Sequence, residues 1–167
     1  KRLGRQAMAE FRSGLGNFDS PVNAFFAEQV PMEQQGTFFA NFIHNQKPSM
    51  DGKWAAAPFP SADPKLTNVT YCNCDVLVIP RGARHKAEAF EFIAYVNRQD
   101  VIEKLCKLHC KFSPLAKVSP EFYKDHANPY VDVFDRLTAS KNARALAQIP
   151  IMPQVLDELT ALSQRIS

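Results

Sequence analysis

One stretch, residues 69–96, constrains the fold of this chain more than any other. It contains a short, uninterrupted and β-branched apolar run at residues 76–79, which is typical of a strand covered on both faces. Pro80 and Gly82 then take the second and fourth positions of an expected type I turn. The helix that follows carries apolar residues at helical spacing: Ala89, Phe92, Ile93 and Val96. A buried strand, a tight turn and an amphipathic helix form one unit, so we expect an α/β protein.

Length and composition are those of an ordinary globular domain. The chain has 167 residues, of which 46% are hydrophobic, and this length suits one domain of common size. The net charge of +3 is small and dispersed, whereas a nucleic-acid-binding surface needs a clustered basic stripe. No apolar run approaches the roughly 20 residues that a membrane span requires. The sequence therefore predicts neither a nucleic-acid-binding surface nor a membrane-spanning segment.

The rest of the chain alternates between helical and extended patterns. Asp100 and Glu103 form a capping-box-like pair ahead of a helix that carries Cys106 and Cys110 on one face. Residues 149–153 hold two prolines, so we expect them to be extended. Further helices are expected at residues 1–12, from Ser20 onward, and at 37–47, 120–125, 129–137 and 154–166, with short strands at 30–32 and 54–60.

The four cysteines form two pairs, and three states of these pairs are compatible with the sequence. Cys72 and Cys74 lie in an expected loop, whereas Cys106 and Cys110 lie on an expected helix. Disulfides need an oxidising compartment, and one between the pairs would pin the loop to the helix. A tetrahedral zinc ion could instead take the four thiolates with His109 as a spare ligand, although neither pair has the common C-x2-C spacing. Free and partly buried thiols are the third alternative.

The sequence holds no recognisable catalytic motif. A nucleophile elbow, an H-E-x-x-H pattern, a Walker loop and the kinase signatures are all missing. Asp132 and Asp135 lie one helical turn apart, and paired carboxylates can hydrolyse glycosides, but a solvated helix face explains the same spacing. We therefore predict a protein that is not an enzyme and has no cofactor and no metal. A small metal-binding module built on the four cysteines and a secreted glycosidase-like enzyme are the alternatives.

Several local patterns, taken in order, resemble the extracellular carbohydrate-binding proteins of ABC importers, of the maltose-binding-protein type. Residues 24–38 are similar to that family's helix followed by Val-Ala-Met and Gly-x-Trp, and residues 54–60 resemble its strand ending in Pro-x-Pro. Residues 73–82 resemble its Gly-Gly loop, apolar strand and Ile-Pro-x-Gly turn. Residues 87–96 resemble its Glu-Ala-Ala-Trp-Glu-Phe-Ile helix. The match spans about the second half of such a protein, so we expect the C-terminal portion of a longer chain.

The resemblance implies a fold and a function. The fold is periplasmic-binding-protein-like, of type II, with two α/β lobes that close on a sugar. Residues 1–62 would belong to one lobe, residues 63–138 to the other after a hinge crossing, and residues 139–167 to a return crossing and a C-terminal helix. The implied function is to capture an extracellular carbohydrate and deliver it to the ABC permease subunits. The implied location is the periplasm or the cell surface, with a lipid anchor outside this segment as the sole membrane attachment.

The resemblance also assigns ligand contacts. Phe38 stands where the family has a tryptophan that stacks on a sugar ring, and an aromatic ring there keeps the stacking chemistry. Gly36 lets the backbone approach the ligand. For Phe38 a plain core position is the alternative, and for Asn73 and Asp75 the alternative is capping of their loop. The full implied set of ligand-binding residues is Gly36, Thr37, Phe38, Tyr71, Asn73 and Asp75.

Overall fold

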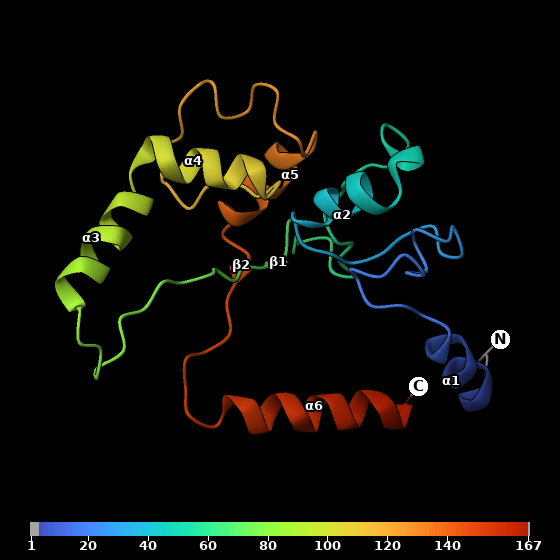
Figure 1. Ribbon diagram of the computed structural model, residues 1–167. Coiled ribbons are helices and arrows are strands. Elements are labelled where there is room, and N and C mark those ends of the chain that lie inside the picture. The colour runs from blue at the N-terminus through green and yellow to red at the C-terminus, as the bar shows by residue number, and fades with distance from the viewer. Residues whose placement is uncertain (1–3, 167) are drawn as a thin grey trace. The chain divides into compact units, whose positions relative to one another are not determined.

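The computed structural model describes residues 4–166 (Figure 1). The chain divides into two compact units. One unit is Gln34–Arg144, and the other joins Lys1–Glu33 with Ala145–Ser167. The sequence placed its lobe boundaries after residues 62 and 138. The two compact units divide after Glu33 and after Arg144, and the predicted lobes stay a prediction.

The regular secondary structure of the unit Gln34–Arg144 is mainly helical. Two short segments, remote in sequence, form its parallel sheet, in which Thr70 pairs with Ala143 and Tyr71 with Arg144. The backbone N–H of Cys72 continues this contact by donating to the carbonyl of Arg144 at 2.7 Å. The elements of the unit are α2 (Phe39–Gln46), the 3-10 helix η1 (Pro48–Met50), β1 (Thr70–Tyr71), α3 (Lys86–Val96), α4 (Gln99–Leu108), α5 (Val131–Thr138) and β2 (Ala143–Arg144).

The core of this unit lies between α4, α5 and the loop that joins them. Ile102 and Cys106 of α4 are buried against Phe122 from the loop and Val131 from α5. Phe122 is 2% exposed, and its ring lies edge-on to the ring of His126 with the centroids 5.2 Å apart. Phe122 therefore anchors the loop in the same core as the helices that flank it.

The other unit contains α1 (Arg5–Ser13) and α6 (Met152–Ile166). The helix α1 ends before Gly14, whose N–H donates to the carbonyl of Phe11 at 3.3 Å. Residues 1–3 of the expected first helix lie outside the described residues. Phe26 is 1% exposed, and its N–H donates to the side chain of Asn23. Among the described residues, no helix combines the length and apolarity that crossing a bilayer demands.

The structure also confirms helices that the sequence predicts between residues 37 and 166. The helix expected at the end of residues 69–96 is α3, and the helix expected after residue 100 is α4. The helices expected at residues 129–137 and 154–166 are α5 and α6. The helix expected from residue 37 is α2, which begins at Phe39. Asp100 is not a cap, because α4 starts at Gln99 with Arg98 in the N-cap position. Pro153 lies in the first turn of α6, where its missing N–H removes no helical hydrogen bond.

The expected strands are wrong. Residues 30–32, 54–60 and 76–79 form no strand, and Val76 and Val78 are 69% and 74% exposed. A strand needs a neighbour that accepts and donates its backbone hydrogen bonds, and the described residues provide none beside 76–79. The tight turn also begins one residue later than expected, because the N–H of Ala83 donates to the carbonyl of Pro80.

Two expected helices are wrong as well. The segment after Ser20 and residues 120–125 form successive turns instead of helices. In the first case the side chain of Asn23 accepts hydrogen bonds from the N–H groups of Phe25 and Phe26, at 2.8 and 3.3 Å. Side-chain bonds of this kind compete with helical ones, which explains why no helix extends from Ser20.

Candidate ligand site

Gly36, Thr37 and Phe38, which the sequence predicts as ligand contacts, form the turn that leads into α2. The N–H of Phe39 donates to the carbonyl of Gly36 at 3.1 Å. A Cβ atom at position 36 would lie 2.5 Å from Cε1 of Phe38, so the absence of a side chain lets the ring lie against the turn. Phe38 is half-buried, whereas Thr37 is 6% exposed. The turn therefore presents the Phe38 ring and keeps the Thr37 side chain inside.

Lys111 joins Phe38 to Asp75, another sequence-predicted contact. Its Nζ lies 2.6 Å from Oδ2 of Asp75 and 5.9 Å from the centroid of the Phe38 ring. The hydrogen bond and the charge of the Lys111 ammonium lower the pKa of the Asp75 carboxyl. The Asp75 side chain is 90% exposed, so this carboxylate is open to water. An aromatic ring, an ammonium group and a carboxylate thus lie together, and we call this set the Lys111 cluster.

Asn128 supports the backbone beneath the Lys111 cluster. Its side chain is 1% exposed, and its Nδ2 donates to the carbonyl of Thr37 at 3.1 Å and to that of Cys110 at 3.4 Å. These two bonds tie the turn that presents Phe38 to the segment that carries Lys111. A buried amide with its donors satisfied holds such segments in one arrangement.

His126 fixes the same segment from the other side. Its Nδ1 accepts a hydrogen bond from the N–H of Asn128 at 3.0 Å, which leaves the proton on Nε2. Nε2 then donates to the carbonyl of Lys111 at 3.2 Å. Burial lowers the pKa of His126, although its bonds to backbone carbonyls act in the opposite direction. The neutral imidazole is therefore the form that this arrangement favours.

The chain's single tryptophan lies at the end of this network. Oδ1 of Asn128 accepts a hydrogen bond from the N–H of Tyr130 at 2.9 Å. The hydroxyl of Tyr130 donates to the carbonyl of Trp54 at 2.7 Å, and the two rings meet edge-on with centroids 4.9 Å apart. A change at Asn128 therefore reaches Trp54 through one intervening residue.

Tyr71 and Asn73 lie apart from the hydrogen bonds of the Lys111 cluster. Tyr71 belongs to β1 and is 54% exposed. Oδ1 of Asn73 accepts a hydrogen bond from the N–H of Cys74 at 3.0 Å, as expected for a residue that caps its own loop. In the described part of the chain, no hydrogen bond joins Tyr71 or Asn73 to Lys111. Their ligand contacts stay a prediction.

All four cysteines are free thiols in the structure. Cys106 and Cys110 are buried, Cys72 is half-buried and Cys74 is exposed. Burial raises the pKa of the Cys106 and Cys110 thiols. Within residues 4–166, no three His, Cys, Asp or Glu side chains gather in a group that could hold a metal ion. The metal-binding alternative therefore has no assembled ligand set in this structure, and the disulfides stay a prediction.

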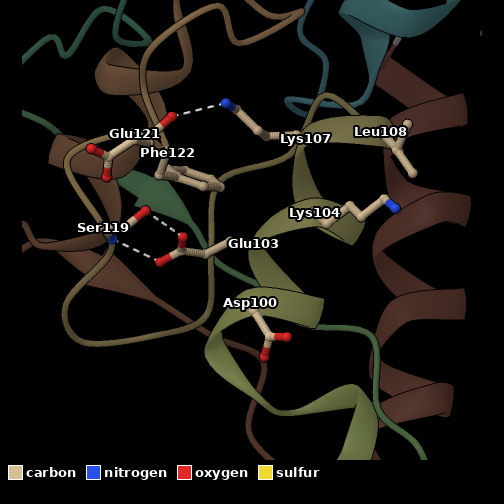
Figure 2. A pocket seen from close by; sticks show the side chains of 8 residues that line it. All are labelled: Asp100, Glu103, Lys104, Lys107, Leu108, Ser119, Glu121 and Phe122. Carbon is tan, nitrogen blue, oxygen red and sulfur yellow. Dashed lines mark hydrogen bonds between the residues drawn. The ribbon is translucent and has the colours of Figure 1, made fainter.

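An open pocket of about 360 Å³ lies beside α4, and two of its α4 residues, Glu103 and Lys107, bond to the loop that follows (Figure 2). Glu103 accepts hydrogen bonds from the N–H and the hydroxyl of Ser119, at 2.7 and 2.5 Å. Lys107 donates from Nζ to the carbonyls of Glu121 and Lys124, at 2.8 and 2.7 Å. Burial opposes the charge of Glu103, but the bonds from Ser119 and Gln99 prevail and lower its pKa. The hydrogen bonds of Glu103 and Lys107 therefore hold the loop after α4 against this helix.

The two carboxylates of the glycosidase alternative both have partners. Asp132 accepts a hydrogen bond from Nη1 of Arg136 at 2.7 Å. Asp135 accepts one from the hydroxyl of Tyr123 at 2.5 Å, and this bond raises the pKa of Tyr123 to about 12. Neither carboxylate lines the pocket beside α4.

Comparison of the chain with protein-family models, with curated protein sequences and with solved structures finds no match. The resemblance to importer-associated sugar-binding proteins therefore depends on the ordered sequence patterns alone.

Proposed function

We propose that this chain belongs to the substrate-binding component of an ABC importer and binds a carbohydrate at the Lys111 cluster. The observation that carries the proposal is the position of the Lys111 Nζ, 2.6 Å from Asp75 and 5.9 Å from the ring centroid of Phe38. A sugar has apolar C–H faces and polar hydroxyls at its edge. An aromatic ring beside a charged donor and a charged acceptor complements both parts.

On binding, the sugar would replace the Lys111 ammonium as the group that faces the Phe38 ring. The Lys111 ammonium now lies over the ring. A sugar that stacks on Phe38 takes this place, and the ammonium turns with Asp75 toward the sugar hydroxyls. The reaction is stoichiometric and involves no bond making. Closure of two lobes follows because the ligand makes some of its contacts in the closed state alone. Delivery to permease subunits, and a periplasmic or cell-surface location, follow from this assignment through the sequence resemblance.

A titration with sugars tests the proposal. Neutral monosaccharides and linear oligosaccharides are added to the full chain, and binding is followed by calorimetry and by Trp54 fluorescence. Phe38→Ala should weaken binding about tenfold, because a stacked aromatic contributes on the order of 1 kcal/mol. Phe92→Ala is the matched control, since Phe92 is 60% exposed on α3. Absence of binding at millimolar sugar, or equal binding by the Phe38→Ala variant, would contradict the proposal.

Lys111 can be tested separately. Lys111→Met keeps the length of the side chain and removes its charge, and it should lower affinity for every sugar that binds. Lys104→Met is the control, because Lys104 is an exposed residue of α4. Equal losses for the two variants would mean that general charge, not the Lys111 cluster, drives binding.

Thiol chemistry tests the proposed export. Proteins in oxidising compartments pair their cysteines. Alkylation of the denatured natural protein without reductant should therefore find Cys72, Cys74, Cys106 and Cys110 at least partly paired. Four alkylated thiols would count against export. One equivalent of bound zinc would replace the proposal with the metal-binding module.

A further inference from the structure

The apolar side of α6 is open to solvent. Val155, Leu159 and Leu162 are 40%, 56% and 51% exposed. A shallow groove of about 440 Å³ runs along this side, and Glu158 and Arg165 line it together with these apolar residues. An exposed strip of this kind on a regular helix marks an interaction surface. The surface can select a partner by charge, because Glu158 and Arg165 lie beside the apolar residues.

The spacing along α6 is that of a two-stranded coiled coil. Met152, Val155, Leu159 and Leu162 alternate in steps of three and four residues, as the a and d positions of a heptad do. Glu158 and Arg165 are seven residues apart, so both take the g position, on the same side of the seam. The e positions, Leu156 and Ser163, carry no charge.

We propose that α6 binds α6 of a second copy of this chain, in an antiparallel pair. In that arrangement a positions meet d positions, so Leu159 of one copy faces Leu162 of the other. The g positions then meet each other, and Glu158 of each copy faces Arg165 of its partner. One two-fold rotation forms both ion pairs, as an interface of two identical surfaces requires.

The charges select both the occupant and its direction. A parallel pair sets each g position against an e position, and the e positions here are uncharged, so Glu158 and Arg165 would gain nothing. The opposite signs at two g positions of one helix complement the same helix reversed. A second copy of this chain is therefore the partner whose chemistry the surface of α6 itself specifies.

The first test is the mass of the full chain in solution. Analytical ultracentrifugation up to about 1 mM protein should show a species of twice 18.8 kDa. Leu159→Glu should return it to the monomer, whereas Phe90→Glu, at a 64% exposed position of α3, should leave the dimer intact. A monomer at every concentration would overturn the proposal. A dimer that survives Leu159→Glu would overturn it equally.

Charge reversal gives the sharper test. Both charged residues lie on the helix surface, so reversing their charges leaves the apolar residues of α6 unchanged. Glu158→Lys alone and Arg165→Glu alone should each weaken the dimer about tenfold, since each variant brings like charges together twice. The double variant should restore the affinity. So should an equimolar mixture of the two single variants, which form complementary pairs with each other. If the double variant and the mixture stay as weak as the single variants, the antiparallel pairing is wrong.

Discussion

The helices α4 and α6 share an amphipathic pattern but differ in how far their apolar residues are buried. Both carry apolar residues at steps of three and four. In α4 one side enters the core, where Ile102 and Cys106 are 8% and 7% exposed, whereas Leu105 and Leu108 stay exposed. In α6 the corresponding residues Leu159 and Leu162 are more than half exposed. Periodicity thus predicts that a helix forms and which side is apolar, but the covering of that side depends on residues elsewhere.

The largest difference between the two helices should appear in how much stability is lost when a large apolar side chain beside or on each helix is truncated. Phe122→Ala removes the ring that is buried against α4, and it should lower the free energy of unfolding by about 3–5 kcal/mol. Leu159→Ala on α6 should change it by no more than about 0.5 kcal/mol at concentrations where the chain is monomeric. Urea denaturation followed by circular dichroism measures both values. Similar losses for the two variants would show that α6 is covered as fully as α4.

Acidic residues sharpen the comparison further. Glu103→Ala leaves the N–H of Ser119 without its buried acceptor and should cost about 2–3 kcal/mol. Glu158→Ala, on the exposed side of α6, should have no measurable effect on the monomer. Because the folded pKa of Glu103 is lowered, its carboxylate stabilises the fold above the ordinary value of 4.5. That stability is lost as the pH falls through the folded pKa, and Glu103→Gln should flatten this part of the pH profile.

A histidine extends the same test toward neutral pH. His126 has a folded pKa below its ordinary value of 6.5, so the neutral ring stabilises the fold fully above pH 6.5. Its contribution is lost as the pH falls through the folded pKa, with a slope of at most about 1.4 kcal/mol per pH unit. His126→Gln should remove this slope in denaturation curves. His85→Gln, at an 81% exposed side chain, should retain it. An unchanged slope in the first variant would mean that His126 is charged in the folded state.

The smallest loss of stability is expected where Tyr123 bonds to Asp135 of α5. Tyr123→Phe removes a hydrogen bond to Asp135 at a 40% exposed residue and should cost about 0.5 kcal/mol. The folded pKa of Tyr123 is raised to about 12, so this contribution is complete below pH 10 and disappears as the pH rises through 12. Ultraviolet absorbance should show one tyrosine that ionises later than the others. Four tyrosines that ionise together would contradict the observed bond.

The difference between α4 and α6 also explains how far the sequence alone could reach. The helices α3, α4, α5 and α6 were predictable because helical hydrogen bonds are local and the apolar spacing is repeated within each segment. Residues 76–79 looked like a buried strand because β-branched residues favour strands. A strand also requires a paired neighbour, and no pattern within four residues reveals whether one exists.

The candidate site shows the same limit. Phe38 and Asp75 were named from patterns in the sequence that resemble a family. Lys111 and Asn128 were missed, because Lys111 meets Asp75 across 36 positions and Asn128 meets Thr37 across 91. A single lysine after a cysteine has no local signature. A map of residue pairs that change together would be the signal capable of finding them.

The contact between Gly36 and Phe38 has a consequence for how the Lys111 cluster can evolve. Phe38 is the N-cap residue of α2, and its ring lies in space that any larger residue at position 36 would fill. Under the proposed function, a larger residue at position 36 would displace the ring on which the sugar stacks, so a new specificity should not arise at this position. Changes in sugar preference should therefore accumulate at the charged positions 75 and 111 of the Lys111 cluster, while the turn from Gly36 to Phe38 keeps its shape.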